Sequence, residues 1–172
     1  MVVLKVMLNL LTVINLAGGM DMNSDINFES EMANIREVIE NSIGWAQTKD
    51  TTVLYNCFVQ DSSLFFFNPD NAGNIDGFDS FRKLTEGFFM QDGFKAVSFK
   101  IKDMKLGISQ SGKTAWWSCY LDDFNEYNGQ PANWVNVRWS GVLDKIDDQW
   151  KIMQMHFSHA IEDFRSDDNA KP

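Results

Sequence analysis

The sequence has little positive charge, and this shortage limits its partners. Its 172 residues include 15 Lys and Arg against 24 Asp and Glu, which gives a formal net charge of -9. Nucleic acid and anionic membranes are polyanions that this charge repels, and no cluster of basic residues offsets the repulsion. The charge therefore excludes nucleic acid as a partner and favours a neutral or cationic small molecule.

Cysteine and histidine are also scarce. Cys57 and Cys119 stand far apart and form neither a CxxC pair nor a Cys/His zinc spacing, so we expect two buried free thiols. His156 and His159 would point to opposite faces of an extended strand, which is poor geometry for one metal ion. No Gly-rich phosphate loop follows a strand-like segment. We therefore expect no metal site and no cofactor.

Long apolar runs are absent except at the start of the chain. Residues 1–19 hold one charged side chain, Lys5, and then an apolar run that ends in Ala17-Gly18-Gly19. This pattern is typical of an export signal, and the run is too short to span a membrane. The alternative is a start codon assigned too early. Residues 1–22 are thus interpreted as a leader, and we expect an exported or periplasmic protein if it is a signal peptide and a cytoplasmic one otherwise.

Helical periodicity dominates the next part of the sequence. Residues 31–49 carry apolar side chains at three- and four-residue spacing, which predicts a long helix with one buried stripe. Asp50 is placed to cap a short second helix, and residues 78–91 predict a third. Between these helices, residues 63–68 predict a short aromatic strand followed by a turn-rich loop.

After Gly93 the pattern changes to the two-residue alternation of strands. Strand-like segments occupy residues 94–103, 104–110, 114–127, 134–146 and 149–161. Long strands with short links predict a curved antiparallel sheet, and helices followed by such a meander predict an α+β fold with one sheet face covered. We expect one domain over residues 23–165 and a polar tail over residues 166–172.

Several motifs in this order of elements resemble the SnoaL-like branch of the nuclear-transport-factor-2-like (NTF2-like) superfamily. They are Gly77 before the third helix, Ala115-Trp116, Arg138-Trp139-Ser140 and the last strand from Trp150 to Ser158. The resemblance covers residues 31–160. It implies a cone, in which a strongly curved antiparallel or mixed sheet wraps around three N-terminal helices. It also implies a pocket at the wide end and a homodimer formed through the outer sheet face.

The superfamily hosts different functions on this one fold. Its members include a polyketide cyclase, steroid isomerases, dehydratases and the association domain of a calcium/calmodulin-dependent kinase. The fold alone does not choose among these functions, so the site residues must decide.

Alternation along the last strand sorts its side chains into two faces. One face would carry Trp150, Ile152, Gln154, His156 and Ser158, and the other Lys151, Met153, Met155 and Phe157. We expect the Met-rich face to form the dimer surface. His156 would then act at the pocket as a general acid or base, or be a satisfied structural group, and both interpretations stay open. Arg138 resembles the arginine of the family's Arg-x-Ser/Thr pattern.

Asp122 and Asp123 lie near the end of an apolar strand, so one must face inward and the other outward. Steroid-isomerase chemistry, which the resemblance implies, needs a carboxylate that moves a proton and an acidic group that holds the oxyanion. Asp122 with Tyr120 or Tyr55 would supply these groups. The alternative is a solvated strand end without catalytic function.

These considerations define one candidate site. The predicted catalytic residues are Asp122 and His156, and the predicted ligand contacts are Trp45, Tyr55, Phe67, Trp117, Tyr120, Arg138 and Ser158. The leading hypothesis is a homodimer that binds a small apolar or aromatic molecule in an aromatic-lined pocket. If it is an enzyme, isomerase, cyclase or dehydratase chemistry without a cofactor fits. The alternative is a non-catalytic dimerisation or association module.

Overall fold

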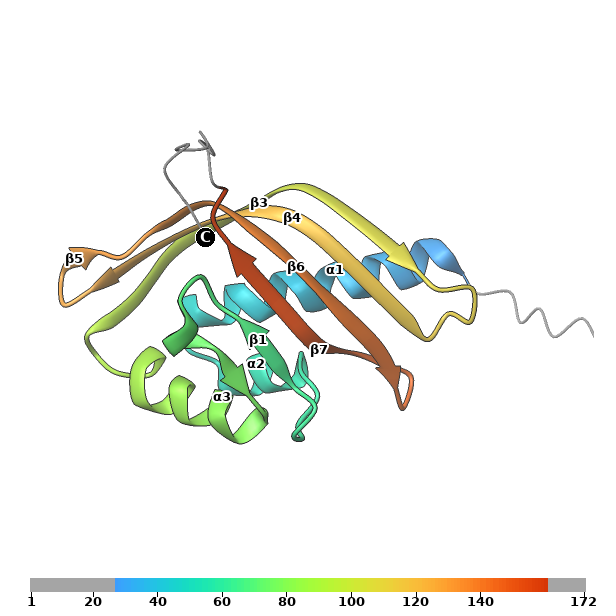
Figure 1. The fold of residues 1–172 in the computed structure, drawn as a ribbon, viewed down its shortest axis with the longest axis horizontal. Coiled ribbons are helices and arrows are strands. Elements are labelled where there is room, and N and C mark those ends of the chain that lie inside the picture. The colour runs from blue at the N-terminus through green and yellow to red at the C-terminus, as the bar shows by residue number, and fades with distance from the viewer. Residues whose placement is uncertain (1–26, 161–172) are drawn as a thin grey trace, which may run out of the picture.

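The structure, a computed structural model, describes residues 27–160, so the predicted leader and the predicted tail lie outside the described residues. Its helices are α1 (Phe28–Gly44), α2 (Thr51–Asn56) and α3 (Phe78–Leu84), with the short helical turns η1 (Trp45–Gln47), η2 (Asn71–Gly73) and η3 (Thr85–Phe89). Its strands are β1 (Phe65–Phe67), β2 (Ile75–Asp76), β3 (Phe94–Ile108), β4 (Thr114–Tyr127), β5 (Gln130–Pro131), β6 (Trp134–Ile146) and β7 (Gln149–Ser158). Figure 1 shows the long strands arching over α1, with α2 and α3 on the same side of the sheet.

Polar caps fix where the first two helices begin. The Asn27 side chain accepts a hydrogen bond from the Ser30 amide at 3.1 Å, so α1 begins earlier than the apolar spacing predicted. The Asp50 side chain caps α2, as predicted, by accepting from the Thr52 and Val53 amides at 2.9 and 3.2 Å. Each such cap contributes about 1 kcal/mol. The buried stripe of α1 includes Ile35 and Ile39, which are fully buried against the sheet side of the core.

The third predicted helix is α3 followed by a wider π-helical turn, η3. Gly77 precedes α3 with φ +77°, a conformation that glycine adopts without steric cost. The buried Thr85 hydroxyl donates to the Phe81 carbonyl at 3.0 Å at the start of η3. π-helical turns occur frequently at functional sites. Here the turn carries Phe88 and Phe89 to the wall of the cavity described below.

The described strands form one mixed sheet in the order β2-β1-β7-β6-β4-β3, with β5 paired to β4. β1 runs parallel to β7, whereas β3, β4, β6 and β7 pair as an antiparallel meander. Asp147 and Asp148 connect β6 to β7 with φ +49° and +60°, the two positive angles of a tight hairpin turn. The α+β cone is therefore the observed fold.

Irregular pairing bends the sheet. The register shifts twice between β3 and β4, once between β4 and β6, and once between β6 and β7. Two of these irregularities hold Asp103 and Asn136 at φ +53° and +54°, and Asp and Asn tolerate this conformation. The segments 94–103 and 104–110 are consequently one bulged strand, β3, and not two strands. Each bulge adds local twist, which closes the sheet around the helices.

The inner face of the sheet is packed with large side chains. Trp117 and Trp139 meet edge to face, with ring centroids 5.5 Å apart, and Trp139 stacks on Phe157 at 5.7 Å. The Trp117 ring lies so close to Gly141 that an added Cβ would overlap it, which explains the glycine at this position. Cys57 and Cys119 are buried free thiols, as predicted, and burial raises the pKa of each to about 12.

Candidate functional site

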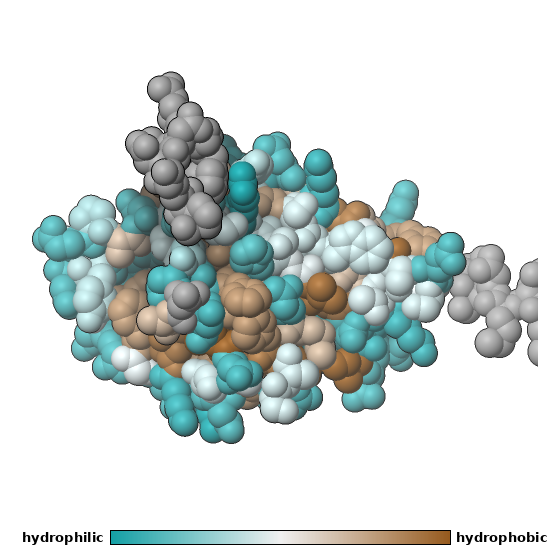
Figure 2. All heavy atoms as spheres, viewed as in Figure 1, coloured by the Kyte–Doolittle hydropathy of each residue, from teal (hydrophilic) through white to brown (hydrophobic). Residues whose placement is uncertain are grey.

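A cavity of about 350 Å³ lies between the helices and the inner face of the sheet. Aromatic side chains from separate elements form much of its wall, among them Trp45, Phe66, Phe89, Phe94, Trp134 and Phe157. The volume lies within the range of small-molecule sites. In the space-filling view, apolar surface gathers between α3 and the bent arm of β3 and β4, with hydrophilic surface around it (Figure 2).

Four polar residues also line the cavity: Ser42, Asn68, Asp123 and Asn125. The Ser42 hydroxyl donates to the Ile39 carbonyl at 2.7 Å inside α1, and the Asn68 amide donates to the Gly73 carbonyl. These two side chains therefore already have backbone partners. Asp123 and Asn125 remain as the pair best placed to bind a ligand's polar group.

The alternation of β4 brings this pair into the cavity. Trp117, Cys119 and Leu121 are buried on the inner face, and two further steps along the strand lead to Asp123 and Asn125. The end of β4 is held in place because the backbone amide of Asn125 donates to Asn133 Oδ1 at 2.9 Å. The Ala132 amide also donates to the Asn125 carbonyl at 2.8 Å.

Burial raises the pKa of Asp123, and a hydrogen bond from the Asn125 side chain partly opposes this effect. Removal from water disfavours the charged form of a carboxyl group. Asp123 is therefore an acid that gives up its proton less readily than a solvent-exposed aspartate. Such a group can serve as either proton donor or proton acceptor near its pKa.

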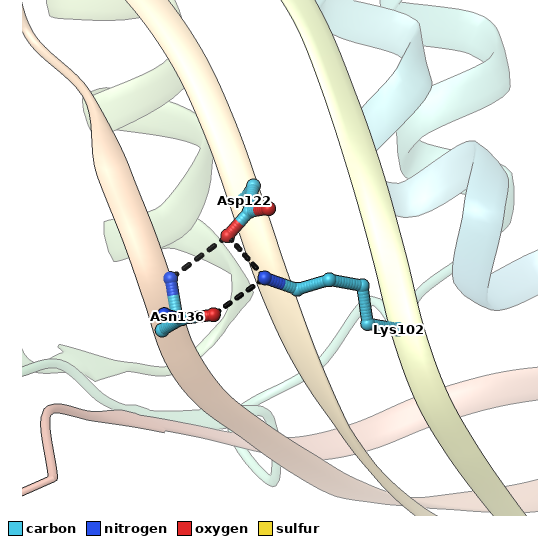
Figure 3. Close-up of polar contacts among 3 residues, drawn as sticks. All are labelled: Lys102, Asp122 and Asn136. Atoms are coloured by element: carbon cyan, nitrogen blue, oxygen red, sulfur yellow. Dashed lines mark hydrogen bonds and ion pairs between the residues drawn. The ribbon is translucent and has the colours of Figure 1, made fainter.

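Asp122 lies on the opposite, outer face of the sheet. Its Oδ1 accepts from Lys102 Nζ at 2.7 Å and from the backbone amide of Asn136 at 2.8 Å, and Lys102 also donates to Asn136 Oδ1 (Figure 3). The Lys102 hydrogen bond, followed by that of Asn136, lowers the pKa of Asp122. The structure thus places Asp123, and not the predicted Asp122, in the cavity.

The predicted faces of β7 are wrong beyond Ile152. β7 pairs Gln154 with Val142 and Ile152 with Leu143, so Met153 is an extra residue that shifts the alternation by one. Met155 consequently points inward and lines the cavity together with Phe157. The Met-rich face predicted as the dimer surface is therefore split between a bulge and the cavity wall.

The same bulge turns His156 outward, where it is exposed. Its ring lies 6.0 Å from that of Phe67, with the planes at 70°. Arg138 sits between Tyr120 and Ser158 in the strand register. These five predicted site residues therefore gather on the outer face, and none of them lines the cavity.

The remaining predicted contacts divide between the cavity and the core. Trp45 lines the cavity, as the prediction requires. Trp117 is 2% exposed and packs in the core. Tyr55 packs edge to face on Phe78 at 5.2 Å, and burial raises the pKa of its hydroxyl. Asn125 and Trp134 are cavity residues that the sequence interpretation missed, although counting inward positions along β4 from Trp117 would have reached Asn125.

Within residues 27–160, no group of three or more His, Cys, Asp or Glu is arranged to hold a metal ion. No helix in the described part of the chain is both long and apolar enough to cross a membrane.

Structural similarity agrees with this architecture. An NTF2-like superfamily protein from Salmonella enterica serovar Typhimurium has 22% sequence identity and a TM-score of 0.65, over 81% of this chain and 98% of that one. A proposed dehydratase of the NTF2-like family from Streptomyces avermitilis has 12% identity and a TM-score of 0.63, over 77% and 98%. The association domain of C. elegans CaMKII has 17% identity and a TM-score of 0.56, over 76% and 97%. At these identities the likeness shows the fold alone.

No curated protein matches the sequence. Residues 35–162, however, match the model of the SnoaL-like domain, and this match covers most of the chain. It shows that the chain belongs to the SnoaL-like family, and its fold is that of the NTF2-like structures named above.

Proposed function

We propose that the protein binds a small, mostly apolar molecule in the cavity, with Asp123 and Asn125 as its polar contacts. The observation that carries this proposal is the position of the two side chains, side by side along the inner face of β4 in an aromatic-walled cavity of about 350 Å³. Sites of this kind bury most of a ligand against apolar walls and orient it with a few polar groups.

Proton transfer is the reaction class that this site supports best. Burial raises the pKa of Asp123, so its carboxyl can accept a proton from carbon or oxygen and return it within one catalytic cycle. The Asn125 side-chain amide has donors that could hold a developing oxyanion. Isomerisation, cyclisation or dehydration of the bound molecule would fit, with Asp123 in the role that the sequence interpretation assigned to Asp122 or His156.

A second candidate function, association, rests on the outer face of the sheet. The outer-face patch consists of Phe67, Trp116, Tyr120, Arg138 and His156, and its first three members are 48%, 51% and 41% exposed. Aromatic residues and arginine are enriched in protein interfaces. We propose that this patch forms a homodimer, which is compatible with ligand binding because the cavity lies on the inner face of the sheet.

Ligand-observed NMR with a set of small aromatic compounds tests the binding function. Wild-type protein should bind some of these compounds. Ala132→Trp should weaken their binding, because Ala132 is an exposed residue of the cavity wall and the larger tryptophan side chain would occupy part of the cavity. Asp122→Asn is the control, since it removes a carboxylate on the outer face. A compound that binds Ala132→Trp and wild type with equal affinity binds outside the cavity. If every compound that binds behaves in this way, the proposal is contradicted.

A further inference from the structure

The carboxyl group in the cavity lacks the partner that the protein gives to comparable carboxylates. Glu31 accepts from Lys145 Nζ at 2.7 Å, and Asp122 accepts from Lys102 Nζ at 2.7 Å. No Lys, Arg or His lies among the described residues that line the cavity, and Asp123 forms no ion pair within residues 27–160. Buried charges in proteins are normally paired, so an ionised Asp123 carboxylate would favour a positively charged ligand beside it.

The walls around this carboxyl group are suited to a cation. Trp45 meets Phe89 edge to face at 6.2 Å, and Phe89 meets Phe94 at 5.0 Å, so these rings form one connected surface. On the sheet side, Trp134 packs against Phe157 at 5.4 Å. The faces of aromatic rings attract ammonium groups, and tryptophan does so most strongly.

An anion would meet the opposite conditions. Asp123 is the single ionisable side chain among the described residues of the cavity wall, and the net charge of the chain is -9. Both the local carboxylate and the overall field would repel a carboxylate or phosphate ligand. A neutral ligand would leave the Asp123 carboxylate unpaired or force it to stay protonated.

We propose that the ligand of the cavity is a cation, namely a substituted ammonium group attached to an aromatic or aliphatic body. The ammonium group pairs with the Asp123 carboxylate, which Asn125 orients, and the body packs against the rings of Trp45 and Trp134. This inference rests on the proposed function, because it names the chemical class of the molecule that the cavity binds.

The pH dependence of binding separates this proposal from a neutral ligand. On the neighbouring strands, Asp123 lies opposite Phe99 of β3 and Trp134 of β6, and no second titratable side chain is among the described cavity residues. A quaternary ammonium does not titrate, so its affinity should rise with pH until Asp123 is fully ionised. A neutral carbonyl or hydroxyl ligand that accepts a hydrogen bond from the protonated Asp123 carboxyl should show the reverse dependence.

The experiment is isothermal titration calorimetry with three probes that share one ring system. They are (2-naphthylmethyl)trimethylammonium, 2-naphthylmethanol and 2-naphthylacetate, each measured on wild type, Asp123→Asn and Asp122→Asn. We expect the ammonium probe to bind wild type at least about ten-fold more tightly than the alcohol, since desolvated cation–π and ion-pair contacts favour it. We also expect Asp123→Asn to lose this preference, Asp122→Asn to keep it, and the acetate to bind most weakly.

Other outcomes overturn the inference at different levels. If the alcohol binds as well as the ammonium, or if ammonium affinity falls as pH rises, the ligand class is wrong while the binding function stands. If none of the three probes binds wild type, the binding function fails together with the ligand class. The pH titration uses unaltered protein, so it remains decisive even if Asp123→Asn does not fold.

Discussion

Asp122 and Asp123 are neighbours in β4, yet they lie on two faces of the sheet with opposite electrostatic environments. Asp122, on the outer face, has its charge stabilised by Lys102 and by the amide of Asn136, which lowers its pKa. Asp123, on the inner face, has its pKa raised by burial, and the hydrogen bond from Asn125 only partly opposes this effect. A single step along a strand therefore separates a structural carboxylate from a candidate functional one.

Trp116 and Trp117 repeat this contrast in packing. Both rings lie over a glycine of the neighbouring strand, Trp116 over Gly107 on the outer face and Trp117 over Gly141 on the inner face. Trp116 is 51% exposed, whereas Trp117 is 2% exposed. At these positions the inner face buries the ring in the core, whereas the outer face leaves half of the ring accessible to solvent or to a partner.

The largest predicted effect comes from truncating the two tryptophans. Trp117→Ala should reduce the free energy of unfolding by about 3–5 kcal/mol, because it opens a void in the core. Trp116→Ala should change it by less than about 1 kcal/mol in the monomer, because half of its ring is already in water. Urea denaturation of both variants at matched protein concentration would measure this difference, and equal losses would contradict the assignment of faces.

The glycines beneath the rings provide a second, smaller contrast. An added Cβ at Gly141 would overlap both the buried Trp117 ring and the Gln154 carbonyl, so Gly141→Ala should cost about 1–3 kcal/mol. At Gly107 the added Cβ would meet the exposed Trp116 ring, which can swing away, so Gly107→Ala should be close to neutral. Thermal unfolding followed by circular dichroism would check this, and a Gly107→Ala variant as unstable as Gly141→Ala would show that the Trp116 ring cannot move.

These contrasts explain which parts of the structure could be predicted from the sequence. Apolar spacing found the helices, since the buried stripe of α1 repeats without interruption, and short links between strands found the meander. The cone and its family followed from the order of elements. The face of each polar residue was harder to predict, because a bulge shifts the alternation without any clear sequence signal at Met153.

Whether a site residue was assigned to the correct face depended on the regularity of its strand. His156 lies four residues beyond Ile152, so it would share the inner face with Ile152 only if β7 were regular. In β4 the inner alternation runs unbroken from Trp117 through Leu121 to Asp123, so the carboxyl that lines the cavity was readable from the pattern. The missed step there was counting, whereas in β7 the missing information was the register with β6.

Charge in the outer-face patch should act on association alone. If the patch forms a homodimer, Tyr120→Lys should place an ammonium group in the interface between its register partners Lys102 and Arg138 and raise the dissociation constant at least about ten-fold, because an unpaired buried charge costs more than 1.4 kcal/mol. Sedimentation velocity over a range of concentrations would measure this. Ser80→Lys, the same change of charge at an exposed residue of α3, is the control. A wild-type protein that stays monomeric throughout would rule out the dimer.

The smallest expected effects, those on the pH dependence of stability, have opposite signs for the two aspartates. Asp122 has a lowered pKa in the folded state, so it contributes stability above its unfolded pKa that is lost as pH falls through its folded pKa. Asp123 has a raised pKa, so the folded state binds its proton more tightly and stability falls as pH rises from the unfolded to the folded value.

Asparagine substitutions should therefore move the two stability curves in opposite directions at neutral pH. Asp122→Asn should be less stable than wild type, because Lys102 loses its counter-charge, and the deficit should shrink in acid. Asp123→Asn should be at least as stable as wild type, because it removes a charge that burial disfavours. Urea denaturation from pH 3 to 8 would compare them. A cationic ligand should make wild type more stable than Asp123→Asn, because it would bind and stabilise wild type alone. It should leave the difference between wild type and Asp122→Asn unchanged. This result would tie the electrostatics of the inner face to the proposed ligand.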